Sequence, residues 1–266
     1  MFFMKNPMKI NQRARNFSLL GARYVILYDS LCKIEEDDMV QNRKLASIQN
    51  KPYVTYAIII ITVIVYIMMT LSGGSQNTEV LIQYGAKFNF AIIYFNQWWR
   101  LITPMFLHIG LAHILFNLLI VYYLGSNLEY FFGHFKYALL YLLGGIMGNI
   151  FSFAFNISIS AGASTAIFGL FMSTIALSRI YPNRIQIQNI ASQYGLLIGL
   201  NIFIGILSTG IDNMGHLGGL VGGYLATYMI TKTHNPGSQL KYTLIYIAIA
   251  LLGIFWGYNE IFYINF

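Results

Sequence analysis

The sequence predicts an all-α membrane protein, a polytopic bundle of seven transmembrane helices. Two observations lead to this prediction. First, 57% of the 266 residues are hydrophobic and only 9% are charged, whereas about 25% of the residues of an ordinary soluble domain are charged. Second, the apolar residues gather in uncharged stretches of about 20 residues, the length that a helix needs to cross about 30 Å of hydrocarbon. The bilayer is therefore the expected solvent for most of the chain.

Residues 1–51 are expected to lie outside the bilayer. They hold nine of the sixteen Lys and Arg residues and five of the nine acidic residues, and Arg23 interrupts their longest apolar stretch. We interpret this segment as a cytoplasmic or interfacial arm. A transit peptide is the alternative, because no acidic residue precedes Asp29.

The first span is predicted at residues 53–71, an uncharged stretch rich in Ile, Val and Met. A long connection, residues 72–103, follows it and carries Trp98-Trp99-Arg100 near its end, a cluster suited to the membrane interface. The connection is too apolar for a solvated loop, so part of it is expected at the bilayer surface. The second span is predicted at residues 109–124.

Residues 137–178 contain no charged side chain over 42 positions, about twice the length that one crossing requires. The stretch must therefore break, and the break is predicted at residues 156–162, with span three before it and span four starting near Ser164. Three more spans follow at residues 190–207, 213–231 and 242–257. The predicted units are an amino-terminal segment (1–51), a six-helix core (52–231), and a linker with a seventh helix (232–266).

The charges predict the orientation of these spans. With a cytoplasmic amino terminus, 14 of the 16 Lys and Arg residues fall on the cytoplasmic side, and only Lys87 and Arg100 lie outside, as the positive-inside rule requires. Ser164 then faces outward. Because the net charge of +7 is distributed over the tail and loops, nucleic acid is not an expected partner. A single cysteine, Cys32, excludes an intrachain disulfide.

Three histidines, His108, His113 and His216, lie in or beside predicted spans, where polar side chains are costly and often functional. Hydrogen bonding between helices is the structural alternative. His113 and Asn117 are four residues apart, so both project from one face of span two and can point at the same spot. A packing pair at a helix interface is the alternative for these two.

Ser164 follows two small residues, Gly162 and Ala163, at the start of span four. Serine is a common N-cap, so this pattern alone is weak evidence. However, the N–H groups and the positive dipole end of the helix would also stabilise an oxyanion. In span six, glycines recur every four residues from Gly215 to Gly223, which lets a neighbouring helix approach closely. This would bring His216 within reach of Ser164 for proton transfer.

Together these residues resemble the rhomboid family of intramembrane proteases. The matching stretches occur in family order over roughly residues 53–231. They are Trp98-Trp99-Arg100-Leu101, Phe106-Leu107-His108, His113-Ile114-Leu115-Phe116-Asn117, Gly162-Ala163-Ser164 with Ile167-Phe168-Gly169, and Asp212-Asn213 with His216-Leu217-Gly218-Gly219.

The resemblance implies that Ser164 is the nucleophile and His216 the general base of a dyad that cleaves peptide bonds in or near transmembrane segments. Single-span or polytopic membrane proteins would be the substrates, the surrounding lipid a further partner, and no cofactor or metal is implied. The implied oxyanion hole comprises His113, Asn117 and the Ser164 N–H. Residues in implied supporting positions are Gly162, His108, and Phe168, which would pack against the imidazole. The six-plus-one arrangement is similar to that of many bacterial and secretory-pathway members rather than to the mitochondrial type. We expect an integral protein of the bacterial cell membrane.

Two positions depart from the family pattern. Thr165 replaces the usual glycine after the nucleophile and is expected to narrow the cleft, whereas Gly215 replaces an alanine with another small residue. Asp212, four residues before His216, is expected to begin a helix in a solvated loop rather than to orient the imidazole.

Two other functions stay open at this point. One is a non-catalytic relative that binds transmembrane segments, although intact Ser164 and His216 disfavour it. The other is a metal or haem protein that uses the three histidines; no neighbouring carboxylate supports it. The oligomeric state is not predicted.

Overall fold

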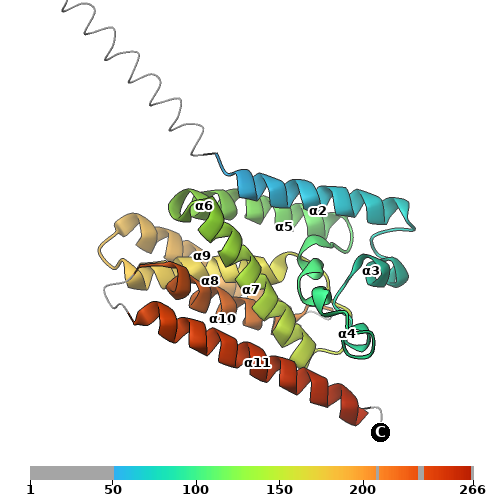
Figure 1. Cartoon of the computed structure of the whole chain (residues 1–266). Coiled ribbons are helices and arrows are strands. Elements are labelled where there is room, and N and C mark those ends of the chain that lie inside the picture. Colours follow the sequence, from blue (N-terminus) through green and yellow to red (C-terminus); the bar gives the residue numbers. More distant parts are fainter. Residues whose placement is uncertain (1–50, 208–209, 233–236, 265–266) are drawn as a thin grey trace, which may run out of the picture. The chain divides into compact units, whose positions relative to one another are not determined.

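The computed structural model describes residues 51–207, 210–232 and 237–264. Most of these residues are helical, and the β-type pairing among them is one isolated antiparallel bridge between Lys87 and Ser160. The predicted fold class, a helical membrane bundle, is confirmed (Figure 1). The elements are α2 (Tyr53–Leu71), α3 (Thr78–Tyr84), α4 (Asn89–Tyr94), η1 (Trp98–Leu101), η2 (Thr103–Phe106), α5 (Leu111–Ile120), η3 (Val121–Gly125), α6 (Ser126–Phe132), α7 (His134–Phe155), α8 (Ser164–Ile180), α9 (Ile185–Leu207), α10 (Asn213–Ile230) and α11 (Ser238–Ile264).

Each predicted span has a helical counterpart in this part of the chain. Within the described residues, four helices are long and apolar enough to cross a membrane: Tyr53–Leu71, Leu111–Phe132, His134–Phe155 and Ser238–Asn259. Helix α8 is apolar but shorter, with 17 residues. The predicted break at residues 156–162 is confirmed, because α7 ends at Phe155 and α8 begins at Ser164. The predicted arm, residues 1–51, lies outside the described residues apart from Lys51.

The second span is longer than predicted, since the helix continues through η3 and α6 to Phe132. The physical reason is that Glu129, the one charged residue in this extension, is not exposed to solvent. Its carboxylate accepts hydrogen bonds from the N–H groups of Val54 and Thr55, each at 2.8 Å. The first N–H groups of a helix have no intrahelical partner, so Glu129 stabilises the start of α2 and keeps its own charge satisfied. Spans five and seven also begin earlier than predicted, at Ile185 and Ser238.

The connection between α2 and α5 is folded rather than extended, in agreement with its apolar composition. It contains two short α-helices and two 3₁₀ turns. Arg100, only 4% exposed, holds them together, because its Nη1 donates to the carbonyl oxygens of Ile82 at 2.8 Å and Ala86 at 2.9 Å. The connection is thus held in one conformation beside the end of α7.

Helices α7, α8 and α10 form the centre of the bundle, between α2 and α11 (Figure 1). Glycine makes their close contact possible. A Cβ atom on Gly219 would lie 2.1 Å from the carbonyl oxygen of Thr165, and one on Gly223 would lie 2.1 Å from that of Gly169. No real side chain fits at such distances. The prediction that a glycine stripe presses span six against span four therefore describes how α10 meets α8.

Candidate active site

Ser164 and His216 meet where α8 and α10 begin. The Oγ atom of Ser164 lies 2.9 Å from Nε2 of His216, a hydrogen-bond distance. On the other side of the imidazole, the ring of Phe168 stacks at a centroid distance of 4.1 Å and an interplanar angle of 11°. Phe168 lies one turn after Ser164 on the same helix, so one helix both presents the serine and fixes the plane of the histidine ring.

The loop before α8 places Ser164 through Gly162. This glycine has φ of +146°, a conformation that side chains rarely adopt, and its Cβ position would lie 2.8 Å from Cε1 of His113. Two hydrogen bonds fix the loop here. The Gly162 N–H donates to the carbonyl oxygen of Pro104 at 2.9 Å, and the Ala163 N–H donates to Nε2 of His108 at 3.2 Å.

His108 has a positioning contact rather than a place in the reaction cavity. It is 0% exposed, and its ring lies edge-on to that of His113 with centroids 5.1 Å apart. Burial, with a smaller contribution from His113, lowers the pKa of His108 to about 3. The ring is therefore neutral, and because Nε2 accepts from Ala163, the proton is assigned to Nδ1.

His113 and Asn117 project from α5 toward the serine. Nδ1 of His113 accepts from the Ile109 N–H at 3.4 Å, which leaves Nε2 to carry the proton of the neutral ring. The Asn117 amide donates to the His113 carbonyl oxygen at 2.7 Å. Because an amide has two N–H groups, one remains as a donor. Both side chains can thus donate at the same place.

A cavity of about 630 Å³ brings these four side chains together. Its wall contains Ser164, His216, His113 and Asn117. The other residues that line it are Ile109, Phe116, Ile120, Asn156, Ser158, Ile159, Ser160, Ala161, Ile167, Phe168, Phe171, Gly210, Ile211 and Asp212. The mixture of polar groups and large apolar side chains suits a peptide segment with water beside it.

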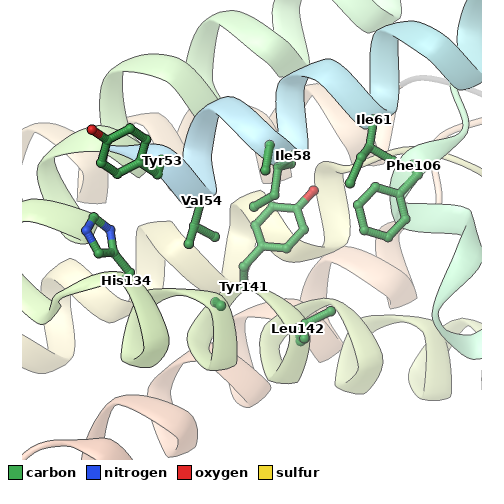
Figure 2. Close-up of a pocket in the computed structure, with 10 residues that line it drawn as sticks. Tyr53, Val54, Ile58, Ile61, Phe106, His134, Tyr141 and Leu142 are labelled. Atoms are coloured by element: carbon green, nitrogen blue, oxygen red, sulfur yellow. The ribbon is translucent and has the colours of Figure 1, made fainter. Parts of the chain in front are cut away.

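A second cavity, of about 500 Å³, lies between α2 and α7. Figure 2 shows Val54 and Ile58 from α2 facing Tyr141 and Leu142 from α7, with His134 near one end and Phe106 near the other. Its lining is apolar apart from a few ring atoms and includes none of the predicted site residues. The cavity of about 630 Å³ is therefore the candidate active site.

Asp212 is placed differently from the expectation. It is the N-cap of α10, as expected, and its Oδ1 accepts from the Gly215 N–H at 3.0 Å. The expectation of a solvated loop holds only in part, because Asp212 is half-buried and its Oδ2 also accepts from the hydroxyl groups of Ser160, at 2.7 Å, and Ser152. Burial alone would raise the pKa of this carboxyl, but the hydrogen bonds from Ser152, Ser160 and Gly215 outweigh it and keep the pKa below its ordinary value.

Thr165 also differs from the expectation, since it does not line the cavity. Its side chain is 2% exposed and points between two helices: its methyl group lies 3.0 Å from where a Cβ of Gly148 would be and 3.1 Å from that of Gly215. The β-branched side chain therefore fills the contact of α7 with α10 and does not narrow the cleft.

Sequence reasoning missed Lys87 as part of the site. Lys87 is 0% exposed, and its Nζ donates to the carbonyl oxygens of Asn156 and Ser158, both at 2.6 Å. A signal was present, because Lys87 is one of just two cations on the predicted outer side of the chain. An isolated cation in an apolar connection indicates a specific partner.

In the described residues, no group of three or more His, Cys, Asp or Glu side chains lies close enough together to hold a metal ion. His108 and His113 are neighbours, but one nitrogen of each is engaged by a backbone N–H. The donor set in this part of the chain therefore suits hydrogen bonding and proton transfer.

Comparison with known proteins finds relatives of this chain in one family. The Rhomboid domain model matches residues 95–233. The chain is 38% identical over 212 residues to Rhomboid protease GluP of Bacillus subtilis (strain 168), an alignment that covers 79% of this chain and 41% of that protein. It is 33% identical over 139 residues to Putative rhomboid protease YdcA of the same organism, covering 52% of this chain and 69% of the relative.

A third relative is RHOMBOID-like protein 7 of Arabidopsis thaliana, 36% identical over 162 residues, which are 60% of this chain and 51% of the relative. The chain thus spans less than two thirds of the length of GluP and of this plant relative.

Proposed function

Because the chain belongs to the rhomboid family, we propose that it is an intramembrane serine endopeptidase that cleaves membrane proteins with a Ser164–His216 dyad. The observation that supports this most directly is the 2.9 Å contact of Ser164 Oγ with His216 Nε2. It lies at a helix amino terminus, in a polar cavity of a membrane bundle. Single-span or polytopic proteins whose transmembrane segments enter this cavity are the proposed substrates.

The mechanism follows from the roles that the geometry permits. Ser164 Oγ attacks the carbonyl carbon of the scissile peptide while Nε2 of His216 takes the hydroxyl proton, since a serine hydroxyl is a poor nucleophile without a base. The imidazolium then gives this proton to the leaving amine as the C–N bond breaks. A water molecule, deprotonated by the same Nε2, attacks the acyl-enzyme and releases the acid and Ser164.

The oxyanion formed in each step requires donors on the opposite side of the carbonyl. Helix α8 offers the Ser164 N–H, because the first N–H groups of a helix have no carbonyl one turn earlier. His113 and Asn117 offer side-chain donors from α5. These groups are fixed before the reaction and act on charge that appears only in the transition state. They therefore lower the activation barrier and do not tighten substrate binding.

We further propose that the amino terminus is cytoplasmic and the active cavity opens outward, in the cell membrane of a bacterium. The charge distribution supports this orientation, with 14 of 16 Lys and Arg residues on the inner side. A reporter that is active only in the periplasm or outside, fused after Phe266, should be active, and one fused at Cys32 inactive. The reverse pattern would overturn the orientation.

The test of function is cleavage of a single-span substrate by the purified protein in detergent. Wild type should cleave it, whereas Ser164→Ala and His216→Ala should each lose at least about a thousandfold in turnover, and the double variant little more, because the two residues act as one unit. A fluorophosphonate should label Ser164 in wild type and much more slowly in His216→Ala. EDTA should change neither rate.

Undiminished cleavage by Ser164→Ala would overturn the serine-protease proposal. Loss of cleavage on chelation alone would favour the alternative in which the histidines bind a metal ion. Binding of the substrate without cleavage by folded wild type would favour the alternative, a non-catalytic relative that retains transmembrane segments.

A further inference from the structure

We propose that Lys87 and Asp212 are positioning residues that both bind the loop of residues 156–160, as a clamp that holds Ser164 against His216. This inference rests on the proposed function, because the clamp acts on the distance between the two dyad residues. It adds an ionic support to a site whose reacting groups are all neutral.

The first half of the clamp is the cation. The backbone of Lys87 pairs with Ser160, with N–H to O distances of 2.9 Å and 3.1 Å, and its Nζ reaches back along the same loop to the carbonyl oxygens of Asn156 and Ser158. Hydrogen bonds from a charged donor are roughly twice as strong as neutral ones. Lys87 thereby fixes both ends of a five-residue loop to the connection between α3 and α4.

The second half is the carboxylate. Asp212 accepts from the Ser160 hydroxyl of the loop and from the Ser152 hydroxyl of α7. It also accepts the Gly215 N–H, and its own backbone carbonyl accepts the His216 N–H at 3.0 Å. One residue therefore connects the loop that leads to the nucleophile with the first turn of the helix that carries the base.

The two charges support each other through the loop, because Lys87 is fully buried and Asp212 is half-buried in the wall of the cavity. A buried charge is costly unless it is paired and hydrogen-bonded. Lys87 satisfies loop carbonyls and Asp212 satisfies hydroxyls and an N–H, so the loop lies between them as a bridge. Without either charge, the other is left uncompensated beside the loop, and residues 156–160 lose the contacts that set the position of α8.

The charge on Lys87 connects the clamp to pH. The charged group that acts on it is Asp212 at the start of α10, and Arg100 on η1 bonds the carbonyl of the neighbouring Ala86. Burial lowers the pKa of Lys87 to about 8, although Asp212 acts in the opposite direction. Above this pH the ammonium becomes a neutral amine, and its hydrogen bonds to the loop lose their charge assistance.

The experiment measures kcat, KM and the rate of fluorophosphonate labelling for wild type, Lys87→Met, Asp212→Asn and the double variant. Each single variant should lose about ten- to a hundredfold in kcat, because displacement of a reacting group by about 1 Å costs about a hundredfold. KM should change less than about threefold, and labelling should slow by the same factor as kcat. The double variant should be no slower than the slower single variant, since both changes release the same loop.

The pH profile separates positioning from a merely structural role. Wild-type kcat should fall as pH rises through about 8, and Lys87→Met should be slow at every pH without that fall. Lys136→Met, an exposed lysine at the start of α7, is the control and should match wild type in rate and profile.

Wild-type kcat in Lys87→Met, or the same alkaline fall in that variant, would overturn the clamp. So would losses in the single variants that multiply in the double variant. If Lys87→Met does not fold, Ser160→Ala decides: it removes one clamp hydrogen bond and should lower kcat about three- to tenfold at an unchanged thermal midpoint, and an unchanged kcat would overturn the proposal. Failure of the proposed function would look different, as folded wild type would neither cleave substrate nor label at Ser164.

Discussion

The two sides of the active cavity are built in different ways. On one side, α8 and α10 meet backbone to backbone, with no space for a single methyl group at Gly219. On the other side, α5 buries Ile114 and Asn117 and leaves four large apolar side chains exposed: Leu111, Leu115, Phe116 and Leu119 at 61%, 59%, 68% and 53%. The proposed dyad lies on the first side, and the proposed side-chain donors of the oxyanion hole lie on the second.

This difference follows the needs of the chemistry. Proton transfer between Ser164 and His216 requires a fixed distance near 2.9 Å, and a glycine contact fixes two helices more closely than flexible side chains can. The proposed substrates must also enter the cavity from the membrane. Helix α5 makes fewer buried contacts, so moving it costs less free energy than moving α10. The groups needed only in the transition state are on this less constrained helix.

The largest effect is expected where the rigid side is forced apart. Gly219→Ala should lower turnover at least about a hundredfold and lower the thermal midpoint by several degrees, because its methyl group would overlap the Thr165 carbonyl oxygen. The measurement is cleavage rate and thermal unfolding in the same detergent. Gly199→Ala is the matched control, since a Cβ at Gly199 on α9 meets no atom within 4 Å. Equal behaviour of the two variants would contradict the assignment of a rigid α8–α10 side.

An intermediate effect is expected on the α5 side. His113→Ala or Asn117→Ala should lower kcat about ten- to a thousandfold with little change in thermal midpoint or KM, because each removes a donor used in the transition state. Labelling of Ser164 should still depend on His216 in both variants. Leu115→Ala, on the exposed face of the same helix, is the control. Wild-type rates in both His113→Ala and Asn117→Ala would show that these two side chains are structural.

The sequence predicted those features that depend on local spacing. Helix spans, the break before Ser164, the glycine stripe and the i, i+4 pair on α5 follow from periodicity and composition alone. The placement of Ser164 beside His216 followed from the glycine stripe and the family resemblance. The first four of these features are properties of short segments, whereas the meeting of Ser164 with His216 joins positions 52 residues apart.

What the sequence did not predict depends on contacts between distant segments. The partners of Lys87 are backbone carbonyls about 70 positions away, and carbonyl groups carry no sequence signature. From the sequence we placed Asp212 in a solvated loop, because its hydrogen-bond partners, Ser152 and Ser160, belong to other elements. From the sequence we predicted that Thr165 faces the cleft, because it follows Ser164. In a helix, however, the next side chain points about 100° away from the one before it.

The smallest effect is expected at Thr165, and it tests how tightly the rigid side is filled. Its Oγ1 is buried and has no hydrogen-bond partner among the described residues, and a buried unpaired hydroxyl costs about 1–3 kcal/mol. Valine has the same shape without this group, so Thr165→Val should raise the thermal midpoint by a few degrees and keep the cleavage rate within about twofold.

Thr165→Gly, which restores the residue usual in the family, is the informative counterpart. If Thr165 crowded the cleft, glycine would raise turnover at unchanged stability. Because the side chain instead fills the space between Gly148 and Gly215, its removal leaves a void and should lower the thermal midpoint, since buried apolar atoms and their contacts are lost. A lower midpoint for Thr165→Val would mean that the hydroxyl is bonded in the folded protein. A faster, equally stable Thr165→Gly would mean that the threonine faces the substrate, and the rigid side would then end at Ser164 rather than extend along the first turn of α8.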